Sequence, residues 1–379
     1  MKKPANSGKT IGVGIVGASA TRGWASVAHI PALQALDAYD IRAVSTTRLD
    51  SAIASADRLG IELAFDTHRS LVSHPEVDLV VVAVKVPGHK QIVGDALAAG
   101  KMVYCEWPLG RNLSDAEEMA ELARDRQLRT VAGLQGALHP PIRFLGDLIR
   151  QGTIGVPLST SIRAHPPEDM WLGRYDPPFE FMAQADDGAT LLSIAVGHAL
   201  EPLAQVLGEF ESLSAVVANQ RGDGIRLADR ATIPKDAPDE IVVAGRLRTG
   251  VIASLHYSAG QTSGQPMVWE IQGTEGSLRI ETATGYMHFG DLAITCRVGR
   301  QPPQRLPVPV RYTNDEPGLG VAAQGVARLY AQLASDLRDG GRTAPDFQVA
   351  LARHRVLDAI AKASETGQRQ SVAPVRRQT

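Results

Sequence analysis

This chain of 379 residues contains few cysteines and has no large excess of charge of either sign. The two cysteines, Cys105 and Cys296, cannot build a disulfide framework or a four-thiolate zinc site, so the sequence indicates a reducing cytoplasm. The 39 Lys and Arg against 41 Asp and Glu leave a net charge of −2. This balance lacks the broad basic surface of a nucleic-acid-binding protein. Length alone allows two or three domains of about 150 residues each.

Long apolar runs and a secretory leader are also missing. The apolar stretches, such as residues 79–84, are far shorter than the ~20 residues that a membrane span needs. The first ten residues, MKKPANSGKT, contain no apolar segment, so we expect no Sec signal peptide. No set of Cys, His and acidic residues has metal-ligand spacing, so we expect no metal. Together these absences predict a soluble, cytoplasmic protein without membrane or nucleic-acid partners.

Short β-rich runs alternate with single helical patterns in the first third of the chain. The β-branched run 11–16 leads through a turn into a helix at 26–38, and the continuous apolar run 77–84 is typical of a strand buried on both faces. Strands that alternate with helices indicate right-handed crossovers and a parallel, doubly wound sheet. We therefore predict a Rossmann domain over residues 8–136. The other predicted elements are strands at 41–45, 63–65, 102–105 and 130–134 and helices at 49–59, 92–99 and from 114 onward.

The pattern changes after residue 135, where strands begin to follow strands. This predicts an α+β domain over residues 137–379, with an open, mostly antiparallel β-sheet flanked by helices. The exposed face of an open sheet must be covered, and self-association is the common solution, so we expect a homo-oligomer, a dimer or a tetramer. The predicted strands are at 157–165, 212–219, 240–247, 252–258, 267–273 and 277–281, and the predicted helices at 141–149, 191–206, 321–338 and 347–364.

The first predicted strand runs directly into a turn of small residues, 17–24 (GASATRGW). Such a turn lets backbone N–H groups approach a pyrophosphate, and the following helix N-terminus supplies partial positive charge. The usual spacing is G-x-G-x-x-G, whereas here Ser19 replaces the second glycine and one residue is added. A turn without a ligand is the alternative, but the place in the first βα unit favours a dinucleotide. The predicted contacts are Gly17, Ser19, Thr21, Arg22, Gly23 and Trp24.

The residues at the end of the second predicted strand indicate whether the ribose of that dinucleotide carries a 2′-hydroxyl group or a 2′-phosphate. An acid there would bind a 2′-hydroxyl group, and an arginine would accommodate a 2′-phosphate. The chain has Thr46, Thr47 and Arg48, with no acid until Asp50. Arg48 favours NADP, but the same side chain could stack on adenine or point to solvent. NAD and NADP are therefore both candidate cofactors.

Three further segments carry a family resemblance: 77–89 (VDLVVVAVKVPGH), 100–109 (GKMVYCEWPL) and 188–198 (GATLLSIAVGH). Together with the turn at Gly17 they resemble the glucose–fructose oxidoreductase / inositol dehydrogenase / rhizopine catabolism (Gfo/Idh/MocA) family over nearly the whole chain. The resemblance implies a nicotinamide-binding domain joined to an open-sheet domain that carries the substrate pocket and the oligomer contact. Sugars, cyclitols and their derivatives are the usual substrates of that family.

Two positions depart from the family's pattern. The usual Glu-Lys-Pro is Glu106-Trp107-Pro108 here, and the acid that usually lies four residues before the histidine is Ile194. Both changes, and the turn, resemble the branch that contains the yeast galactose-regulon repressor. That relative binds a dinucleotide but acts as a regulator, so the resemblance supports cofactor binding more directly than turnover.

Oxidising an alcohol needs a base for the hydroxyl proton and stabilisation of the developing alkoxide. His198 is the base candidate, because imidazole titrates near neutrality and the resemblance places it at the pocket; a core histidine is the alternative. Trp107 has no charge to replace the usual Lys, and its indole either stacks on nicotinamide or sugar or only packs. Lys85 follows the 77–84 run at the rim where parallel sheets bind ligands, so its ammonium is a second catalytic candidate. A solvated loop lysine is the alternative.

The remaining candidates follow from the resemblance and from polar composition. Glu106 is expected to orient the nicotinamide ribose, and Pro87 and His89 resemble the family's nicotinamide-side loop. The stretch 163–175, rich in hydrogen-bond donors and aromatics, suits a sugar pocket or is a plain polar loop. The further cofactor candidates are Val86, Pro87, His89, Glu106, Trp107 and Gln135. The substrate candidates are Trp107, His139, Arg163, His165, Arg174, Tyr175 and His198.

Three functions are consistent with these residues. The first is an NAD(P)-dependent oxidoreductase that transfers hydride between nicotinamide and a sugar or sugar derivative, with His198 as acid/base. The second is a dinucleotide-binding regulator without turnover. The third is a redox-assisted glycosidase, in which oxidation at ring C3 acidifies the C2 hydrogen, the aglycone is eliminated and the bound cofactor is recycled.

Overall fold

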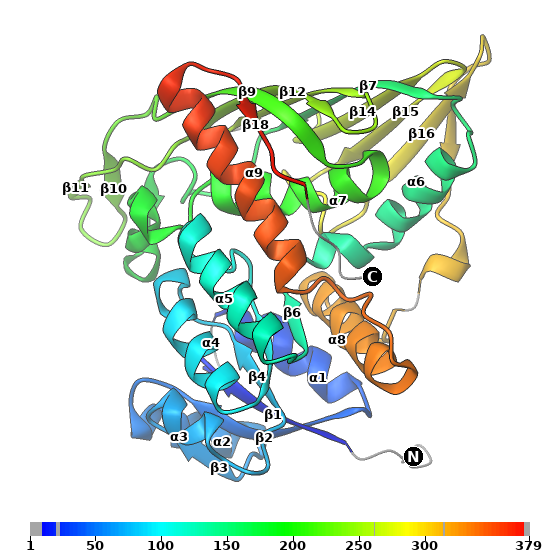
Figure 1. The fold of residues 1–379 in the computed structure, drawn as a ribbon. Helices are drawn as coiled ribbons and strands as arrows, with labels where there is room; N and C mark the ends of the chain where they lie inside the picture. The colour runs from blue at the N-terminus through cyan, green and yellow to red at the C-terminus, as the bar shows by residue number, and fades with distance from the viewer. Residues whose placement is uncertain (1–9, 20–22, 261, 314, 375–379) are drawn as a thin grey trace. The chain divides into compact units, whose positions relative to one another are not determined.

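The structure is a computed structural model that describes residues 10–19, 23–260, 262–313 and 315–374. Two compact units make up the chain (Figure 1). The first holds the described residues up to 110 together with 114–133 and 315–350, and the second holds 111–113, 134–314 and 351–379. This grouping differs from a single boundary after residue 136, because helix α8 (Val321–Asp339) packs on elements near the N-terminus and belongs to the first unit.

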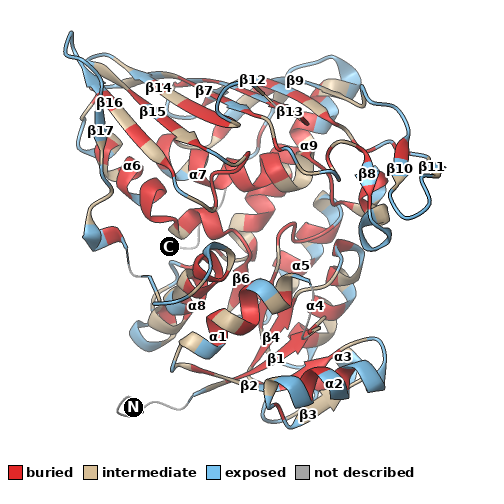
Figure 2. Cartoon of the chain, turned by 180° about the vertical axis from the view of Figure 1, so that it is seen from behind, coloured by how far each residue is buried: buried red, intermediate tan, exposed pale blue. Residues whose placement is uncertain are grey.

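A six-stranded parallel sheet in the order β3-β2-β1-β4-β5-β6 forms the centre of the first unit. The order reverses direction between β1 and β4, which is the doubly wound arrangement predicted from the alternating pattern. All four residues of β4 are buried, as the continuous apolar run indicated (Figure 2). The Rossmann fold is confirmed. Its strands are β1 (Ile11–Val16), β2 (Tyr39–Ser45), β3 (Leu63–Phe65), β4 (Leu79–Val82), β5 (Met102–Cys105) and β6 (Thr130–Ala132).

Helices on this sheet follow the predicted pattern with two local differences. The segment predicted as one helix at 26–38 is a five-residue π-helix, η1 (Ala25–His29), followed by the short α1 (Ile30–Ala35). A short helix, α3 (His68–Val72), was not predicted. α8 packs against both η1 and α1. The other helices are α2 (Leu49–Leu59), η2 (Val86–Gly88), α4 (His89–Ala98) and α5 (Leu113–Asp125).

The second unit is built on a nine-stranded sheet in the order β17-β16-β15-β14-β7-β13-β12-β9-β18. Neighbouring strands are antiparallel except β7 and β13, which are parallel. The predicted open, mostly antiparallel sheet is therefore confirmed. Its strands are β7 (Pro157–Ala164), β9 (Phe210–Ala218), β12 (Glu240–Leu247), β13 (Ile252–Ser258), β14 (Met267–Gly273), β15 (Gly276–Thr282), β16 (Ala293–Val298), β17 (Gln304–Leu306) and β18 (Gln370–Ser371). A small separate sheet contains β8 (Arg174–Tyr175), β10 (Gly224–Arg226) and β11 (Thr232–Ile233).

Side chains on the central strands alternate between a buried and an exposed face. Ile241 and Val243 of β12 are fully buried, whereas Val242 between them is 43% exposed. Ile252 of β13 is 54% exposed. The helices of this unit lie on the buried side of the sheet (Figure 1). The labelled ones are α6 (Pro140–Arg150), α7 (Gly197–Leu207) and α9 (Phe347–Thr366), and the unit also contains η3 (Gln135–Leu138), η4 (Pro177–Ala183), η5 (Ala185–Asp187), η6 (Leu192–Val196) and η7 (Val310–Tyr312).

One helical run in the described part of the chain is long and apolar enough to cross a membrane. It spans the 23 residues Ala185–Leu207, where η5, η6 and α7 follow one another. The expectation that no stretch reaches this length is therefore wrong. However, 72% of the most apolar window is buried inside the structure, as in the core helix of a globular protein, and α7 is almost wholly buried in Figure 2.

Candidate functional site

The turn after β1 can be built only with glycine at its first position. Gly17 has a φ of +92°, a left-handed conformation that L side chains rarely adopt. A Cβ atom on Gly17 would lie 2.7 Å from the carbonyl oxygen of Ala83 and 2.8 Å from Cγ1 of Val84. The turn therefore presses against the loop that follows β4, at the edge of the sheet where strands β1 and β4 end. This is the predicted place for a pyrophosphate.

The second half of the turn leads directly into the first helical element, η1. Gly23 has a φ of +84°, and its carbonyl oxygen accepts hydrogen bonds from the N–H groups of Ser26 and Val27. Trp24 is half-buried, and its Nε1 is buried without a hydrogen-bond partner among the described residues. Two of the predicted contacts, Thr21 and Arg22, lie outside the described residues. The glycine conformations and the unpaired indole donor fit a dinucleotide phosphate at this turn.

A buried histidine holds the carboxylate of Glu106. His29, the last residue of the π-helix η1, is fully buried, and its Nε2 lies 2.9 Å from Oε1 of Glu106. The other ring nitrogen, Nδ1, lies 2.7 Å from the hydroxyl of Tyr330 in α8. The His29 ring thus lies between the Tyr330 hydroxyl and the Glu106 carboxylate. π-helical turns often occur at functional sites, and this one ends on the residue that orients Glu106.

The other side of the Glu106 carboxylate lies close to the backbone of Gly133. A Cβ atom at Gly133, just after β6, would lie 2.5 Å from Oε2 of Glu106, so only glycine fits there. Tyr104 lies beneath, and burial together with the nearby Glu106 charge raises the pKa of its phenol well above the usual range. The side chain of Glu106 is 12% exposed. A fixed, partly exposed carboxylate at this edge fits the ribose contact predicted for it.

The loops after β4 and β5 are joined by His89. Its Nε2 lies 3.0 Å from the carbonyl oxygen of Val84, and its Nδ1 lies 3.0 Å from that of Pro108. His89 is 1% exposed, and burial lowers its pKa. The structure thus gives His89 a bridging position behind the loop, because both ring nitrogens face main-chain carbonyl groups. Trp107, which is joined to Pro108 by a cis peptide bond, is 6% exposed.

Lys85 and Arg48 are exposed. Lys85 is exposed three residues after the end of β4 and directly precedes η2. Arg48, expected near the ribose, is paired with Asp50, and its Nε lies 3.0 Å from Oδ1 of that residue. The ion pair raises the pKa of Arg48 and lowers that of Asp50. Thr46 caps the same turn through a hydrogen bond from its hydroxyl to the carbonyl of Arg48, 2.8 Å long. This turn thus offers both an arginine, which would suit a 2′-phosphate, and an acid, which would suit a 2′-hydroxyl group. The structure therefore favours neither NAD nor NADP.

The second unit brings His198 together with a histidine that sequence reasoning missed. His198, the second residue of α7, and His288, in the loop between β15 and β16, stack with ring centroids 3.8 Å apart and planes 17° apart. They are 7% and 6% exposed. Burial, and then the neighbouring His198 and His139, lower the pKa of His288 well below its usual value. The Nδ1 of His288 is buried without a hydrogen-bond partner among the described residues.

The η3 turn closes this cluster from a third side. A Cβ atom on Gly136 would lie 2.9 Å from Cγ of Pro202 in α7 and 3.2 Å from Cβ of His288. Gln135 and His139, at the two ends of the turn, are 4% and 6% exposed. Because a second positive charge on stacked imidazoles is strongly disfavoured, at most one ring of the His198–His288 pair carries a positive charge. The predicted residues His198 and His139 therefore do belong to one buried cluster.

Tyr286, which lies next to His288, is hydrogen-bonded to Glu168 and Trp171. The ring of Tyr286 lies 5.3 Å from that of His288, and the Tyr286 hydroxyl donates to Oε2 of Glu168 at 2.7 Å. The same hydroxyl accepts a 2.6 Å hydrogen bond from Nε1 of Trp171. Burial, and then the Glu168 charge, raise the pKa of Tyr286, so its hydroxyl stays protonated. No sequence motif indicated Tyr286 or His288 as site residues, since both lie in a loop without regular periodicity.

Four of the predicted substrate residues do not join this cluster. Arg163 lies on the exposed face of the nine-stranded sheet, next to Ser254 and His256 in a shallow hollow, whereas α7 lies on the other side (Figure 1). His165 follows β7, with its ring 6.5 Å from that of His256. Tyr175 is 1% exposed and packs in the small sheet, where Gly224 faces its ring, and burial raises its pKa to about 12. Arg174 is exposed in the same strand. The alternation of strand side chains separates residues that are adjacent in the sequence.

Models of known families match both units. Residues 11–134 match the family described as "Oxidoreductase family, NAD-binding Rossmann fold" (GFO_IDH_MocA), and residues 140–282 match the model of the Gal80p C-terminal domain. The galactose/lactose metabolism regulatory protein GAL80 of Saccharomyces cerevisiae is 30% identical over 75% of this chain and 69% of its own length. The chain belongs to the Gfo/Idh/MocA oxidoreductase family. The predicted family resemblance is confirmed.

Enzymes and regulators are both similar to this Gfo/Idh/MocA protein. The dehydrogenase aclE of Aspergillus oryzae is 29% identical over 95% of the chain and 98% of its own length. The structure of a super-repressor mutant of S. cerevisiae Gal80p superimposes with a TM-score of 0.84 at 24% identity, covering 96% of this chain and 98% of that one. Levoglucosan dehydrogenase in complex with NADH and levoglucosan superimposes with a TM-score of 0.82 at 20% identity, covering 96% and 100%. The last two likenesses show the fold, and the family's first unit is an NAD-binding one.

No group of His, Cys, Asp and Glu side chains within the described ranges is arranged to hold a metal ion. The polar groups of the two units instead fit organic ligands. The first unit offers the glycine turn and the fixed Glu106 carboxylate. The second offers a pair of buried, stacked imidazoles.

Proposed function

We propose that this protein is an NAD(P)-dependent oxidoreductase that interconverts a secondary alcohol of a sugar or sugar derivative and the corresponding ketone. The observation that carries this proposal is the stacked pair of His198 and His288. A buried imidazole that lies against a second, neutral imidazole is suited to take up and return a hydroxyl proton. The family relation to dehydrogenases over 95% of the chain supports the reaction class.

In the oxidation direction the carbinol C–H and O–H bonds break. A bound nicotinamide supplies the hydride acceptor. The hydroxyl proton goes to His198, and the electron pair of the O–H bond forms the carbonyl π bond. His288, kept neutral by burial and by its neighbours, lies flat against His198 and fixes the plane of the reacting ring. In the reverse direction His198 returns the proton to the alkoxide oxygen.

In the first unit we assign the dinucleotide to the edge formed by Gly17, Gly23 and Glu106. The glycine turn approaches the pyrophosphate, and Glu106, fixed by His29 and Gly133, accepts a hydrogen bond from a ribose hydroxyl. Lys85 is the cationic residue assigned to the developing alkoxide, in place of the family's usual lysine that Trp107 replaces. We place the reaction in the cytoplasm, in line with the two unpaired, buried cysteines.

The test is an incubation of the purified protein with NAD or NADP and a panel of sugars, cyclitols and glycosides. Reduced cofactor is followed by absorbance, and released aglycone by chromatography. Net cofactor reduction that is lost in His198→Asn supports the proposal. His256→Asn is the matched control, because His256 is an exposed histidine on the sheet face and is paired with Glu240. Lys85→Met, if Lys85 has the assigned role, lowers kcat and leaves dinucleotide affinity unchanged.

A second function, a dinucleotide-binding regulator without turnover, is favoured by one specific observation. The second unit matches the Gal80p C-terminal model, and the residues at Trp107 and Ile194 are not those of the usual dehydrogenase pattern. Tight binding of NAD or NADP, with no substrate of the panel turned over and no effect of His198→Asn, would favour this function. Aglycone release without net cofactor reduction would instead indicate the redox-assisted glycosidase.

A further inference from the structure

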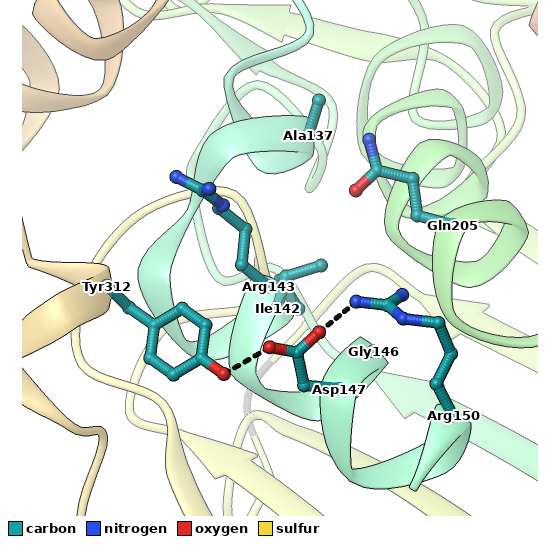
Figure 3. A pocket seen from close by; sticks show the side chains of 8 residues that line it. All are labelled: Ala137, Ile142, Arg143, Gly146, Asp147, Arg150, Gln205 and Tyr312. Carbon is teal, nitrogen blue, oxygen red and sulfur yellow. Dashed lines mark hydrogen bonds and ion pairs between the residues drawn. The ribbon is translucent and has the colours of Figure 1, made fainter.

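A second hollow in the second unit lies between α6, α7 and η7. It has a volume of about 200 Å³ and is bounded by Arg143, Asp147 and Arg150 of α6, by Gln205 of α7 and by Tyr312 of η7 (Figure 3). The three elements are far apart in the sequence, so the tertiary fold alone assembles this set. None of the five residues belongs to the histidine cluster or to the dinucleotide turn. The hollow therefore needs a separate explanation.

The carboxylate of Asp147 makes the main polar contacts within the hollow. Asp147 accepts a hydrogen bond from the hydroxyl of Tyr312 and is paired with Arg150. Arg311 donates from Nη2 to the same Tyr312 hydroxyl at 3.1 Å, and its guanidinium lies 4.9 Å from the centre of the tyrosine ring. The hydrogen bond from Tyr312, followed by the charges of Arg150 and Arg311, holds the pKa of Asp147 below its usual value although burial acts in the opposite direction. Asp147 is thus an ionised, immobilised anchor.

The charges around this anchor do not balance. Arg143, Arg150 and Arg311 carry three guanidinium groups, whereas Asp147 is the one carboxylate among the described residues that lines the hollow, and it is paired with Arg150. The side chain of Arg143 makes no hydrogen bond or ion pair with any described residue. Glu201, the next acid on α7, is already engaged by Arg353 at 3.5 Å and by Gln205. A hollow with an unmatched guanidinium at its wall attracts an anion.

Gln205 adds a neutral acceptor to the opposite wall. Its Nε2 donates to Oε1 of Glu201 at 3.0 Å, which fixes the amide and leaves its carbonyl oxygen as the free group. In Figure 3 this amide faces the side chains of α6 across the hollow. A carbonyl oxygen at this position accepts a hydrogen bond from a ligand hydroxyl group.

We propose that this hollow is a binding site for a small hydroxylated anion, whose carboxylate or phosphate is held by Arg143 and Arg150 and whose hydroxyl donates to Gln205. Arginine binds both kinds of oxyanion through its planar, forked donors. The hollow of about 200 Å³ opens to solvent, and its polar groups suit the head of a small anion. This site is independent of the proposed oxidoreductase activity.

The test is isothermal titration of the full chain in a phosphate-free buffer of low ionic strength, because exposed charges are screened by salt. The probes are inorganic phosphate, glycerate, glycerol 3-phosphate and, as an uncharged control, glycerol. Glycerate and glycerol 3-phosphate separate the carboxylate source from the phosphate source. Arg143→Gln is expected to weaken the binding of every anionic probe by about tenfold or more. Arg297→Gln, which removes an exposed arginine of β16, is the matched control and leaves the affinities unchanged.

A second variant tests the hydroxyl contact. Gln205→Leu is expected to weaken glycerate and glycerol 3-phosphate severalfold and to leave inorganic phosphate unchanged. The proposal is overturned if none of the anions binds saturably, if Arg143→Gln binds them as the unchanged protein does, or if Arg297→Gln weakens them equally. Equal effects of Gln205→Leu on all anions overturn the assignment of the hydroxyl. Thermal unfolding of each variant checks that the exposed substitutions leave the fold intact.

Discussion

His198 and His288 stack face to face, with ring centroids 3.8 Å apart, although 90 residues separate them in the sequence. The contact joins the first turn of α7 to the loop between β15 and β16. Two imidazoles at this distance cannot both be charged without strong repulsion, so the protonation of one decides that of the other. This coupling is the basis of the acid/base role assigned to His198 and can be measured without a substrate.

Titration of the imidazole C–H signals by NMR tests that coupling. We expect the His288 signal to stay that of a neutral ring down to low pH, because burial and then the His198 and His139 charges lower its pKa. In His198→Phe, which keeps a flat ring, the pKa of His288 is expected to rise, because the neighbouring His198 charge is lost. In His256→Phe it does not move. Two independent titrations near pH 6.5 in the unchanged protein would contradict the stacked arrangement.

The same pKa directions predict how stability depends on pH. For His288 and His89 the folded pKa lies below the unfolded one, so between the two values the unfolded chain binds more protons. Stability is therefore complete above about pH 6.5 and falls as the pH decreases below it, by up to about 1.4 kcal/mol per pH unit for each histidine. Urea unfolding at pH 5, 6, 7 and 8 measures this slope. In His288→Gln the slope below pH 6.5 is expected to be smaller, and an unchanged slope would exclude His288 as a source.

The dinucleotide turn can be tested with two glycines of similar conformation. Gly17 and Gly60 both have positive φ, but only the Cβ of Gly17 would collide with its surroundings, whereas that of Gly60 meets open space. Each Gly→Ala change is expected to cost about 1–2 kcal/mol for the left-handed backbone. Gly17→Ala is expected in addition to move the turn and abolish NAD(P) binding in calorimetry. If Gly17→Ala and Gly60→Ala bind the dinucleotide equally well, the pyrophosphate does not lie at Gly17.

His29 acts as a positioning residue for Glu106. His29→Phe keeps the volume but removes both polar contacts of the ring, to Glu106 and to Tyr330. We expect the affinity for NAD(P) to fall about tenfold, since the carboxylate is no longer held toward the ribose. The matched control is His68→Phe, which breaks a histidine–aspartate contact to Asp95 elsewhere in the same unit. Equal losses in both variants would indicate a general destabilisation in place of a positioning role.

Self-association is expected to use the exposed face of the nine-stranded sheet. Val216, Val242 and Ile252 on this face are 63%, 43% and 54% exposed, an unusual set of apolar side chains for a surface that stays in water. Val242→Lys is expected to shift sedimentation toward the monomer. Val310→Lys, at an 83% exposed valine of η7, serves as the control. A monomeric unchanged protein would show that the face is not an interface between copies.

Local patterns predicted most elements because they are set by neighbours in the sequence. The strands Ile11–Val16, Met102–Cys105, Glu240–Leu247, Ile252–Ser258 and Met267–Gly273 begin and end where the alternation and the turn residues indicated. The predicted helix at 191–206 proved to be two elements, since a π-helical turn precedes His198. The strands after residue 282 were missed, because their short runs lack clear alternation. The π-helical turn and these short strands depend on packing with distant segments, which the periodicity of the sequence does not show.

The sequence by itself determined that this protein has a dinucleotide-type turn after its first strand, a parallel sheet and a second open sheet, because each depends on short-range spacing of small, apolar and β-branched residues. It also marked Glu106, His139 and His198. Only the tertiary structure decided what these residues touch. His29 and Tyr330 reach Glu106, His288 reaches His198, and Arg163 turns to the far face of the sheet, since side-chain contacts between distant segments depend on how strands are ordered and how helices pack upon them.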